Sequence, residues 1–176
     1  MRSYLLLATS CVLIGCQRGD VVRRAGEPDV VKVSADDPEM SAAIAEARKA
    51  VPPFIDRVQH PSPTQTYVAV KMRLTEGDAV EHVWLDHLSF DGTRLRGLLG
   101  NAPTDVRHVK LGDTLTVAPD SISDWMLVDR DTVYGAYTTY VLRDHLSAAE
   151  RQSFNHDQGV FFGPKPRSLS ESPNER

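Results

Sequence analysis

The hydrophobic residues of this chain change period at Pro61-Ser62-Pro63. Before this breaker, apolar residues recur at the spacing of one helix face, at Met40, Ala43, Ile44, Ala47 and Val51. After it, apolar and polar residues alternate, which is typical of half-buried β-strands. A helix followed by many short strands predicts an α+β domain built on an antiparallel sheet.

The helix has clear start and stop signals. Asp37 is a good N-cap, Pro38 suits the first helical position, and Glu39 places an acidic residue in the first turn. Pro52-Pro53 is expected to end this helix, and residues 54–58 are expected to form a second short turn.

Five short strands are expected after the breaker, at 66–74, 80–90, 94–99, 114–118 and 122–128. Asp91-Gly92 is a strong hairpin signal between the second and third of them. Residues 137–146 fit a helix or a strand, and the capping box Ser147-Ala148-Ala149-Glu150 predicts a last helix to about Phe154. We therefore expect an N-terminal helix, an antiparallel sheet of about five strands and a C-terminal helix. Strands this short could close into an SH3-like barrel.

The N-terminus predicts export and lipidation. Arg2 precedes an apolar stretch from Tyr4 to Ile14, which is the length of a signal-peptide core and too short to span a bilayer. The stretch ends in Leu13-Ile14-Gly15-Cys16, which resembles the lipobox of bacterial lipoproteins. That resemblance implies cleavage before Cys16, acylation of Cys16 and a lasting membrane anchor. Because Gln17 is not an aspartate, sorting to the outer membrane is favoured.

These signals divide the chain into four parts. We assign residues 1–15 to a signal peptide, 16–35 to the lipidated cysteine and a tether, 36–155 to a single domain, and 156–176 to a disordered tail. Cys11 would leave with the signal peptide and Cys16 would carry lipid, so the domain is expected to lack a disulfide or a thiol site.

The net charge of the chain and the spacing of its histidines limit the kinds of ligand and partner that it is expected to bind. The formal net charge of −4 argues against a nucleic-acid partner, which needs a clustered basic face. No pair of the six histidines has the spacing of a zinc site on a helix, and no motif indicates a cofactor. We therefore predict no metal, no cofactor and no nucleic acid.

Several short stretches together resemble the YegJ-like family of uncharacterised bacterial proteins, domain of unknown function 2314. They are Asp37-Pro38-Glu39-Met40, Glu81-His82-Val83-Trp84-Leu85, Gly100-Asn101-Ala102-Pro103, Val109-Lys110-Leu111-Gly112-Asp113, Ile122-Ser123-Asp124-Trp125-Met126, Gly135-Ala136-Tyr137-Thr138 and Leu142-Arg143-Asp144. The likeness spans residues 36–154. It implies domain boundaries and no activity, because the function of the family is not established.

Two groups of residues are candidates for a binding site. In strand 80–90, Val80, His82, Trp84, Asp86 and Leu88 are expected on one face, where Trp84 would stack on a ligand or pack in the core. In strand 122–128, Ile122, Asp124, Met126 and Val128 are expected on one face, opposite Ser123, Trp125 and Leu127. Asp124 is then either a buried acid with a raised pKa or an acceptor of backbone N–H bonds. Trp125 and Tyr137 complete the candidate set.

Three functions remain open from these observations. The first is a non-enzymatic, envelope-anchored module that binds a protein, a glycan or a small ligand. The second is a small hydrolase or lyase that uses Asp124 with His82 or Tyr137. The third is an immunity or inhibitor lipoprotein.

Overall fold

The computed structural model describes residues 20–24, 27–32, 37–148, 150–152, 154 and 162–170. The chain divides into two compact units, Met1–Ser34 and Ala35–Arg176. In the first unit, strands β1 (Asp20–Arg24) and β2 (Glu27–Lys32) form an antiparallel hairpin inside the segment expected to be a tether. The predicted signal peptide and Cys16, the residue predicted to be lipidated, lie outside the described residues.

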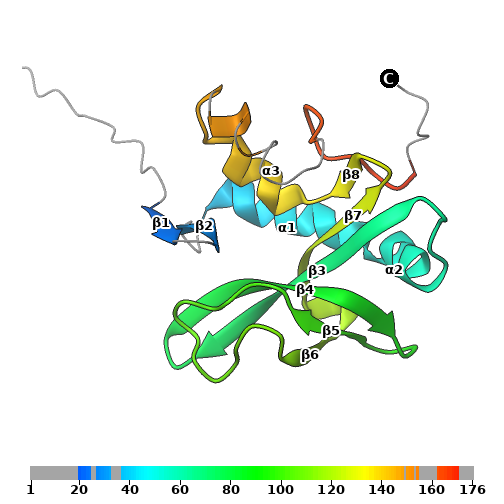
Figure 1. The fold of residues 1–176 in the computed structure, drawn as a ribbon, viewed down its shortest axis with the longest axis horizontal. Coiled ribbons are helices and arrows are strands. Elements are labelled where there is room, and N and C mark those ends of the chain that lie inside the picture. Colours follow the sequence, from blue (N-terminus) through cyan, green and yellow to red (C-terminus); the bar gives the residue numbers. More distant parts are fainter. Residues whose placement is uncertain are drawn as a thin grey trace, which may run out of the picture. The chain divides into compact units, whose positions relative to one another are not determined.

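The second unit is an α+β domain, as predicted. Its main elements are α1 (Pro38–Lys49), α2 (Val51–Gln59), β3 (Gln65–Glu76), β4 (Ala79–Phe90), β5 (Leu95–Leu99), β6 (Thr114–Val117), the short 3₁₀ helix η1 (Pro119–Ser121), β7 (Ile122–Asp129), β8 (Thr132–Gly135) and α3 (Tyr137–Asp144) (Figure 1). Six strands form one antiparallel sheet in the order β6-β5-β4-β3-β7-β8. Because β6 and β8 are its two edges, the sheet is open, and the expectation of an SH3-like barrel is wrong.

The cap signals of the first helix are confirmed. Asp37 accepts hydrogen bonds from the amides of Glu39 and Met40, at 2.8 and 2.9 Å. The segment after Pro52 forms a full second helix, α2, and not only a turn. This is possible because its prolines occupy the first turn, where the amide hydrogens have no intrahelical acceptor.

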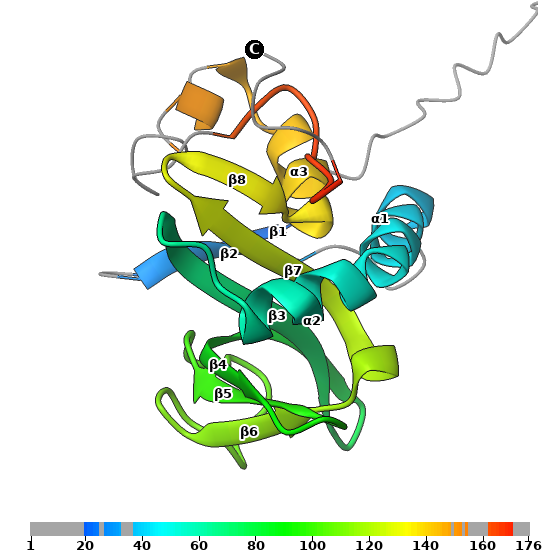
Figure 2. The ribbon, with the colours of Figure 1, turned by 90° about the vertical axis from the view of Figure 1, so that its right-hand side faces the viewer.

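Strand β3 joins two halves of the sheet. Residues 65–72 of β3 pair with β7, and residues 70–76 pair with β4. Figure 2 shows β7 and β8 at one end of β3 and β4, β5 and β6 at the other. The three central strands lie side by side only at residues 70–72, so side chains there are enclosed from both sides.

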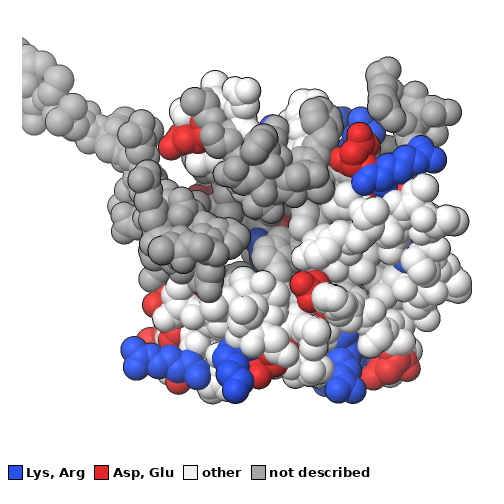
Figure 3. Space-filling model, in the orientation of Figure 1, with Lys and Arg blue, Asp and Glu red and all other residues white. Residues whose placement is uncertain are grey.

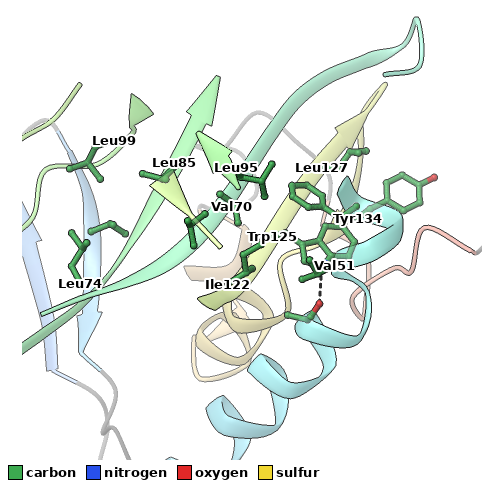
Figure 4. Close-up of a cluster of buried hydrophobic side chains, with 14 of the residues drawn as sticks. Val51, Val70, Leu74, Leu85, Leu95, Leu99, Ile122, Trp125, Leu127 and Tyr134 are labelled. Carbon is green, nitrogen blue, oxygen red and sulfur yellow. Dashed lines mark hydrogen bonds between the residues drawn. The ribbon is translucent and has the colours of Figure 1, made fainter. Parts of the chain in front are cut away.

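The main core lies between the helices and one face of the sheet (Figure 4). Trp125 stacks on Phe54 of α2, with ring centroids 5.0 Å apart, and its indole Nε1 donates a hydrogen bond to the Ala47 carbonyl oxygen at 3.0 Å. A second cluster contains Val128, Val133, Ala136, Tyr140 and Phe162. The core therefore extends beyond residue 155, where the sequence suggested that the domain ends.

Residues 162–170 differ from the disordered tail that was predicted. Phe162 is buried against Tyr140, Leu169 packs against the main core, and the Arg167 carbonyl accepts a hydrogen bond from the Gly135 amide at 2.9 Å. The capping box before this segment forms as predicted. The Ser147 amide donates to the Glu150 carboxylate, and the Glu150 amide donates to the Ser147 hydroxyl.

Two irregularities change which residues share a face. Lys71 pairs with Asp124 but Met72 pairs with Ile122, so β7 has one extra residue, Ser123, at this point of the ladder. Because of this bulge, Ile122 lies in the core with Trp125 and not on the face of Asp124. Along β4, the register with β5 shifts at His87, which has a φ of 49°, and Leu88 turns toward the core. The expected faces are wrong for Ile122 and Leu88 because alternation fails at a bulge.

The undecided segment at 137–146 is helical, as α3, and it follows the short strand β8, which was not predicted. Among the described residues, no helix has both the length and the apolar composition needed to cross a membrane.

Candidate functional site

A buried lysine occupies the centre of the sheet. Lys71 lies in β3, opposite Trp84 of β4 and Asp124 of β7, and it is only 8% exposed. Its ammonium group is covered by Thr138 of α3 and by the ring of Trp84, both of which its Nζ contacts. A buried ammonium group needs a partner to offset the loss of hydration.

The partner on the β7 side is Asp124, which is fully buried. Its Oδ1 accepts hydrogen bonds from the amides of Trp125 and Tyr137, at 2.8 and 3.1 Å. Its Oδ2 accepts from the amide and the hydroxyl of Thr138, at 2.8 and 2.5 Å. Both carboxylate oxygens therefore hold the first residues of α3.

The turn before α3 explains why this helix needs a cap from elsewhere. Gly135 and Ala136 both have positive φ angles, of 72° and 57°, and the alanine at the cap position has no polar side chain. A Cβ atom at Gly135 would lie 2.5 Å from the Trp125 carbonyl oxygen, so only glycine fits there. Asp124 supplies the missing cap and places a negative charge at the helix N-terminus, where it is favourable.

Thr138 joins the two buried charges. Its hydroxyl donates to Asp124 and accepts a hydrogen bond from Lys71 Nζ at 2.7 Å. Burial raises the pKa of the Asp124 carboxyl, an effect that Lys71 and the hydrogen bonds from Thr138 oppose. Burial lowers the pKa of Lys71, and the charge of Asp124 opposes that shift. Each charge therefore favours the ionised form of the other.

On the other side of Lys71, Trp84 and His82 reach the surface of the sheet. Lys71 Nζ lies 4.6 Å from the centroid of the Trp84 ring, a cation–π contact, and Trp84 is half-buried. His82 is exposed, and its Nδ1 lies 2.9 Å from the Ser123 hydroxyl.

Ser123 determines the tautomer of His82. The serine hydroxyl donates its one hydrogen to the Lys71 carbonyl oxygen at 3.1 Å, so it can only accept from His82. His82 Nδ1 is therefore the donor, and Nε2 of the neutral ring keeps a lone pair. Desolvation, together with the charges of Lys71, Arg73 and Arg48, lowers the pKa of His82 to about 4, so the ring is neutral at pH 7.

The five predicted binding residues separate into two groups. Asp124 and Trp125 are buried, and Tyr137 brings its amide to Asp124 and packs its ring edge against Trp125, with centroids 5.9 Å apart. His82 is exposed and Trp84, like Tyr137, is half-buried; His82 contacts Ser123 and not Asp124.

Sequence reasoning missed Lys71, Thr138 and Glu81. Lys71 alternates with apolar residues, as an exposed residue of a half-buried strand would, but Thr138 of α3 and the Trp84 ring cover it. Glu81 is also buried, and its carboxylate accepts hydrogen bonds from the amides of Thr104 and Asp105, at 2.9 and 3.0 Å. A signal for Glu81 was that it shares a strand face with the apolar residues Val83 and Leu85, although no spacing identifies its distant partners. Within the described residues, no group of three or more histidine, cysteine, aspartate or glutamate side chains could hold a metal ion.

Comparison with models of protein families identifies the family of this chain. A family model described as an uncharacterized protein conserved in bacteria, DUF2314, matches residues 37–162. The chain belongs to this family.

Two relatives share about a third of their aligned residues with it. The uncharacterized protein YegJ of Escherichia coli K12 is 35% identical over 103 residues, which are 58% of this chain and 66% of YegJ. A protein of Neisseria meningitidis serogroup B described as an ankyrin repeat protein is 35% identical over 88 residues, which are 50% of this chain. The match spans only 35% of that relative's length. No solved structure matches the chain.

Four of the seven stretches that carry the DUF2314 resemblance contact each other in pairs. Asp124-Trp125 and Gly135–Thr138 form the cap of α3, and Asn101 accepts a hydrogen bond from the Trp84 amide at 2.7 Å. These stretches lie far apart along the chain. The likeness therefore corresponds to the contacts that hold α3, Trp84 and the sheet together in this DUF2314 domain.

Proposed function

We propose that this chain is a lipoprotein of the bacterial cell envelope whose DUF2314 domain is a non-enzymatic binding module. Its N-terminus would carry lipid on Cys16, and its domain would face the periplasm or the cell surface. The partner would be an envelope protein, a glycan or a small ligand.

Support for the anchor comes from the sequence. The apolar stretch Tyr4–Ile14 is directly followed by Gly15-Cys16, and the distance from Cys16 to the Asp37 cap leaves about twenty residues to separate domain and membrane.

The main support for a binding function is the difference between the candidate residues on the two sides of Lys71. Asp124, the acid of the hydrolase alternative, has both oxygens engaged by four donors at the start of α3. A carboxylate held in this way stabilises the fold and is poorly placed to exchange protons with a substrate. His82 and Trp84 instead present an imidazole and an aromatic ring at the surface, which are groups that bind ligands.

The anchor is tested by Cys16→Ser, with Cys11→Ser as the matched control. Both variants would be expressed in a Gram-negative host, labelled with an alkyne analogue of palmitate and fractionated into membrane and soluble material. We expect Cys16→Ser to lose the label and leave the membrane fraction, and Cys11→Ser to keep both. Label on Cys16→Ser, or its loss from Cys11→Ser, would contradict the proposed anchor.

A further inference from the structure

One part of the sheet surface gathers positive charge around an imidazole and an aromatic ring. Arg73 of β3 and His82 of β4 are directly opposite each other, and Trp84 follows on the same face of β4. Side chains two residues apart in a strand are about 7 Å apart, so one ligand of the size of a sugar ring can touch all three.

Arg48 of α1 adds a second exposed cation to this group. Its Nε donates a hydrogen bond to the Ile122 carbonyl at 2.9 Å, which holds the guanidinium group beside the start of β7. Ile122 precedes Ser123, and the Ser123 hydroxyl contacts His82. Arg48, Arg73 and Lys71 all lie near enough to His82 to lower its pKa.

The two arginines are not neutralised by acids. In the part of the chain that the structure describes, neither Arg48 nor Arg73 forms an ion pair, and no acidic group contributes to the pKa shift of His82. Elsewhere, acidic and basic side chains are mixed, as along the lower edge of Figure 3. In a chain with 24 acidic and 20 basic side chains, such a local excess of cations attracts an anionic group.

We propose that Arg73, His82 and Trp84, with Arg48 beside them, bind a sugar that carries a carboxylate. The inference rests on the proposed binding function and names its ligand class. The arginine guanidinium groups pair with the carboxylate, because two parallel N–H bonds match its geometry. The Nε2 lone pair of neutral His82 accepts a hydrogen bond from a hydroxyl group of the sugar.

Trp84 supplies the apolar contact of the site. Lys71 lies against its ring, and the ring is only half-buried, which leaves part of its apolar area accessible beside Arg73 and His82. A flat aromatic surface flanked by donors and an acceptor suits the flat, polar-edged ring of a sugar. An isolated inorganic anion would use the arginines and leave Trp84 without a role.

Two envelope sugars provide a matched test, because N-acetylmuramic acid is N-acetylglucosamine with an added lactyl carboxylate. The full chain in detergent micelles would be titrated with each sugar, and with inorganic phosphate, while NMR follows the Trp84 indole and His82 ring signals. We expect N-acetylmuramic acid to shift both signals and to bind at least about tenfold more tightly than N-acetylglucosamine.

Variants then localise the binding. Arg73→Gln should weaken N-acetylmuramic acid binding about tenfold. Arg96→Gln is the control, because it makes the same change at an exposed position of β5 and should leave the affinity unchanged. Trp84→Leu should bind the acidic sugar no more tightly than it binds phosphate. Its far-UV circular dichroism spectrum would show that the domain remains folded.

Three results would overturn the inference: equal affinity for the two sugars, shifts confined to other residues, or the same affinity and shifts with phosphate alone. The anchor test separates this inference from the proposed function. Membrane fractionation that depends on Cys16, without sugar binding, would reject the ligand class and retain the anchored module. Sugar binding by a chain that carries no lipid would reject the anchor alone.

Discussion

Charged and polar side chains lie on both sides of Lys71, but those on one side are buried and fully hydrogen-bonded and those on the other side are exposed. Toward α3, the charges of Lys71 and Asp124 are buried and every Asp124 oxygen is engaged by donors inside the fold. Toward the surface of β3 and β4, Arg73 and His82 are exposed, and the guanidinium group has no acidic partner among the described residues.

The difference shows how residue type alone misleads about function. An aspartate among apolar neighbours suggests an acid–base site, but here it caps a helix from a neighbouring strand. The histidine at the exposed rim is the group that keeps an unused acceptor. Burial with complete hydrogen bonding indicates a structural role, whereas an exposed charge without a partner leaves that group available to the ligand proposed above.

The largest effect is expected from removing the buried carboxylate. Asp124→Ala leaves Lys71 buried without its counter-charge and leaves three amides of the α3 junction without an acceptor, so we expect a loss of about 4 kcal/mol in unfolding free energy. Asp124→Asn keeps one acceptor oxygen and should lose about 2 kcal/mol. Urea melts at neutral pH would measure both. A stabilised Asn variant would instead favour an acid kept for catalysis.

The turn into α3 gives the next test. In Gly135→Ala, the new Cβ meets the Trp125 carbonyl oxygen and indole ring, and we expect a loss of about 3 kcal/mol. Gly112→Ala is the matched control, because Gly112 also has a positive φ, of 84°, but has open space around it. It should lose about 1 kcal/mol. If thermal melts gave equal losses, close packing at the α3 junction would not be what requires Gly135.

A smaller effect tests whether residues after 161 support the same helix. Phe162 packs on Tyr140 of α3 with ring centroids 5.5 Å apart. Phe162→Leu keeps an apolar side chain and loses the ring contact, so it should cost about 1.5 kcal/mol in denaturant melts. Leu111→Ala, at a residue that is 57% exposed, should change stability by less than about 0.5 kcal/mol. A Phe162 variant as stable as the Leu111 variant would mean that this segment does not support the domain.

The last test concerns the exposed side. The pKa of His82 is about 4 in the folded state and near 6.5 when unfolded, so the unfolded state binds more protons between these values. His82 therefore makes the domain less stable as pH falls from 6.5 toward 4, since protonation would place a charge near Lys71 and Arg73 of β3 and Arg48 of α1. When the pH falls from 7.5 to 5, the unfolding free energy of His82→Asn should therefore decrease by less than that of the natural chain.

The control for this pH effect is Arg96→Gln, because Arg96 is an exposed residue of β5, is not among the charges that act on His82, and does not titrate between these pH values. Its urea midpoints at pH 7.5 and pH 5 should change as those of the natural chain do. An identical pH dependence in the His82 variant would remove the argument that three cations act on this imidazole.

The sequence predicted the parts of the fold that depend on neighbouring residues. The cap of α1, the hairpin at Asp91-Gly92 and the strand periods of β3 and β4 follow from local hydrogen bonds and from side-chain alternation. The candidate site was predicted only in part. His82 and Trp84 were correctly placed on one face of one strand, but their neighbours Arg73 and Arg48 come from other elements.

Sequence alone thus determined the α+β class, the capped first helix and the family, because these depend on local chemistry and on short ordered motifs. Tertiary structure decided the rest. Residues 137–144 became a helix because Asp124, thirteen residues earlier, supplies the cap that Ala136 lacks. Lys71 became buried because Thr138 of α3 and Trp84 of β4 cover its ammonium group. Such long-range pairings leave no trace in the spacing of a single segment, since each partner contributes only half of the interaction.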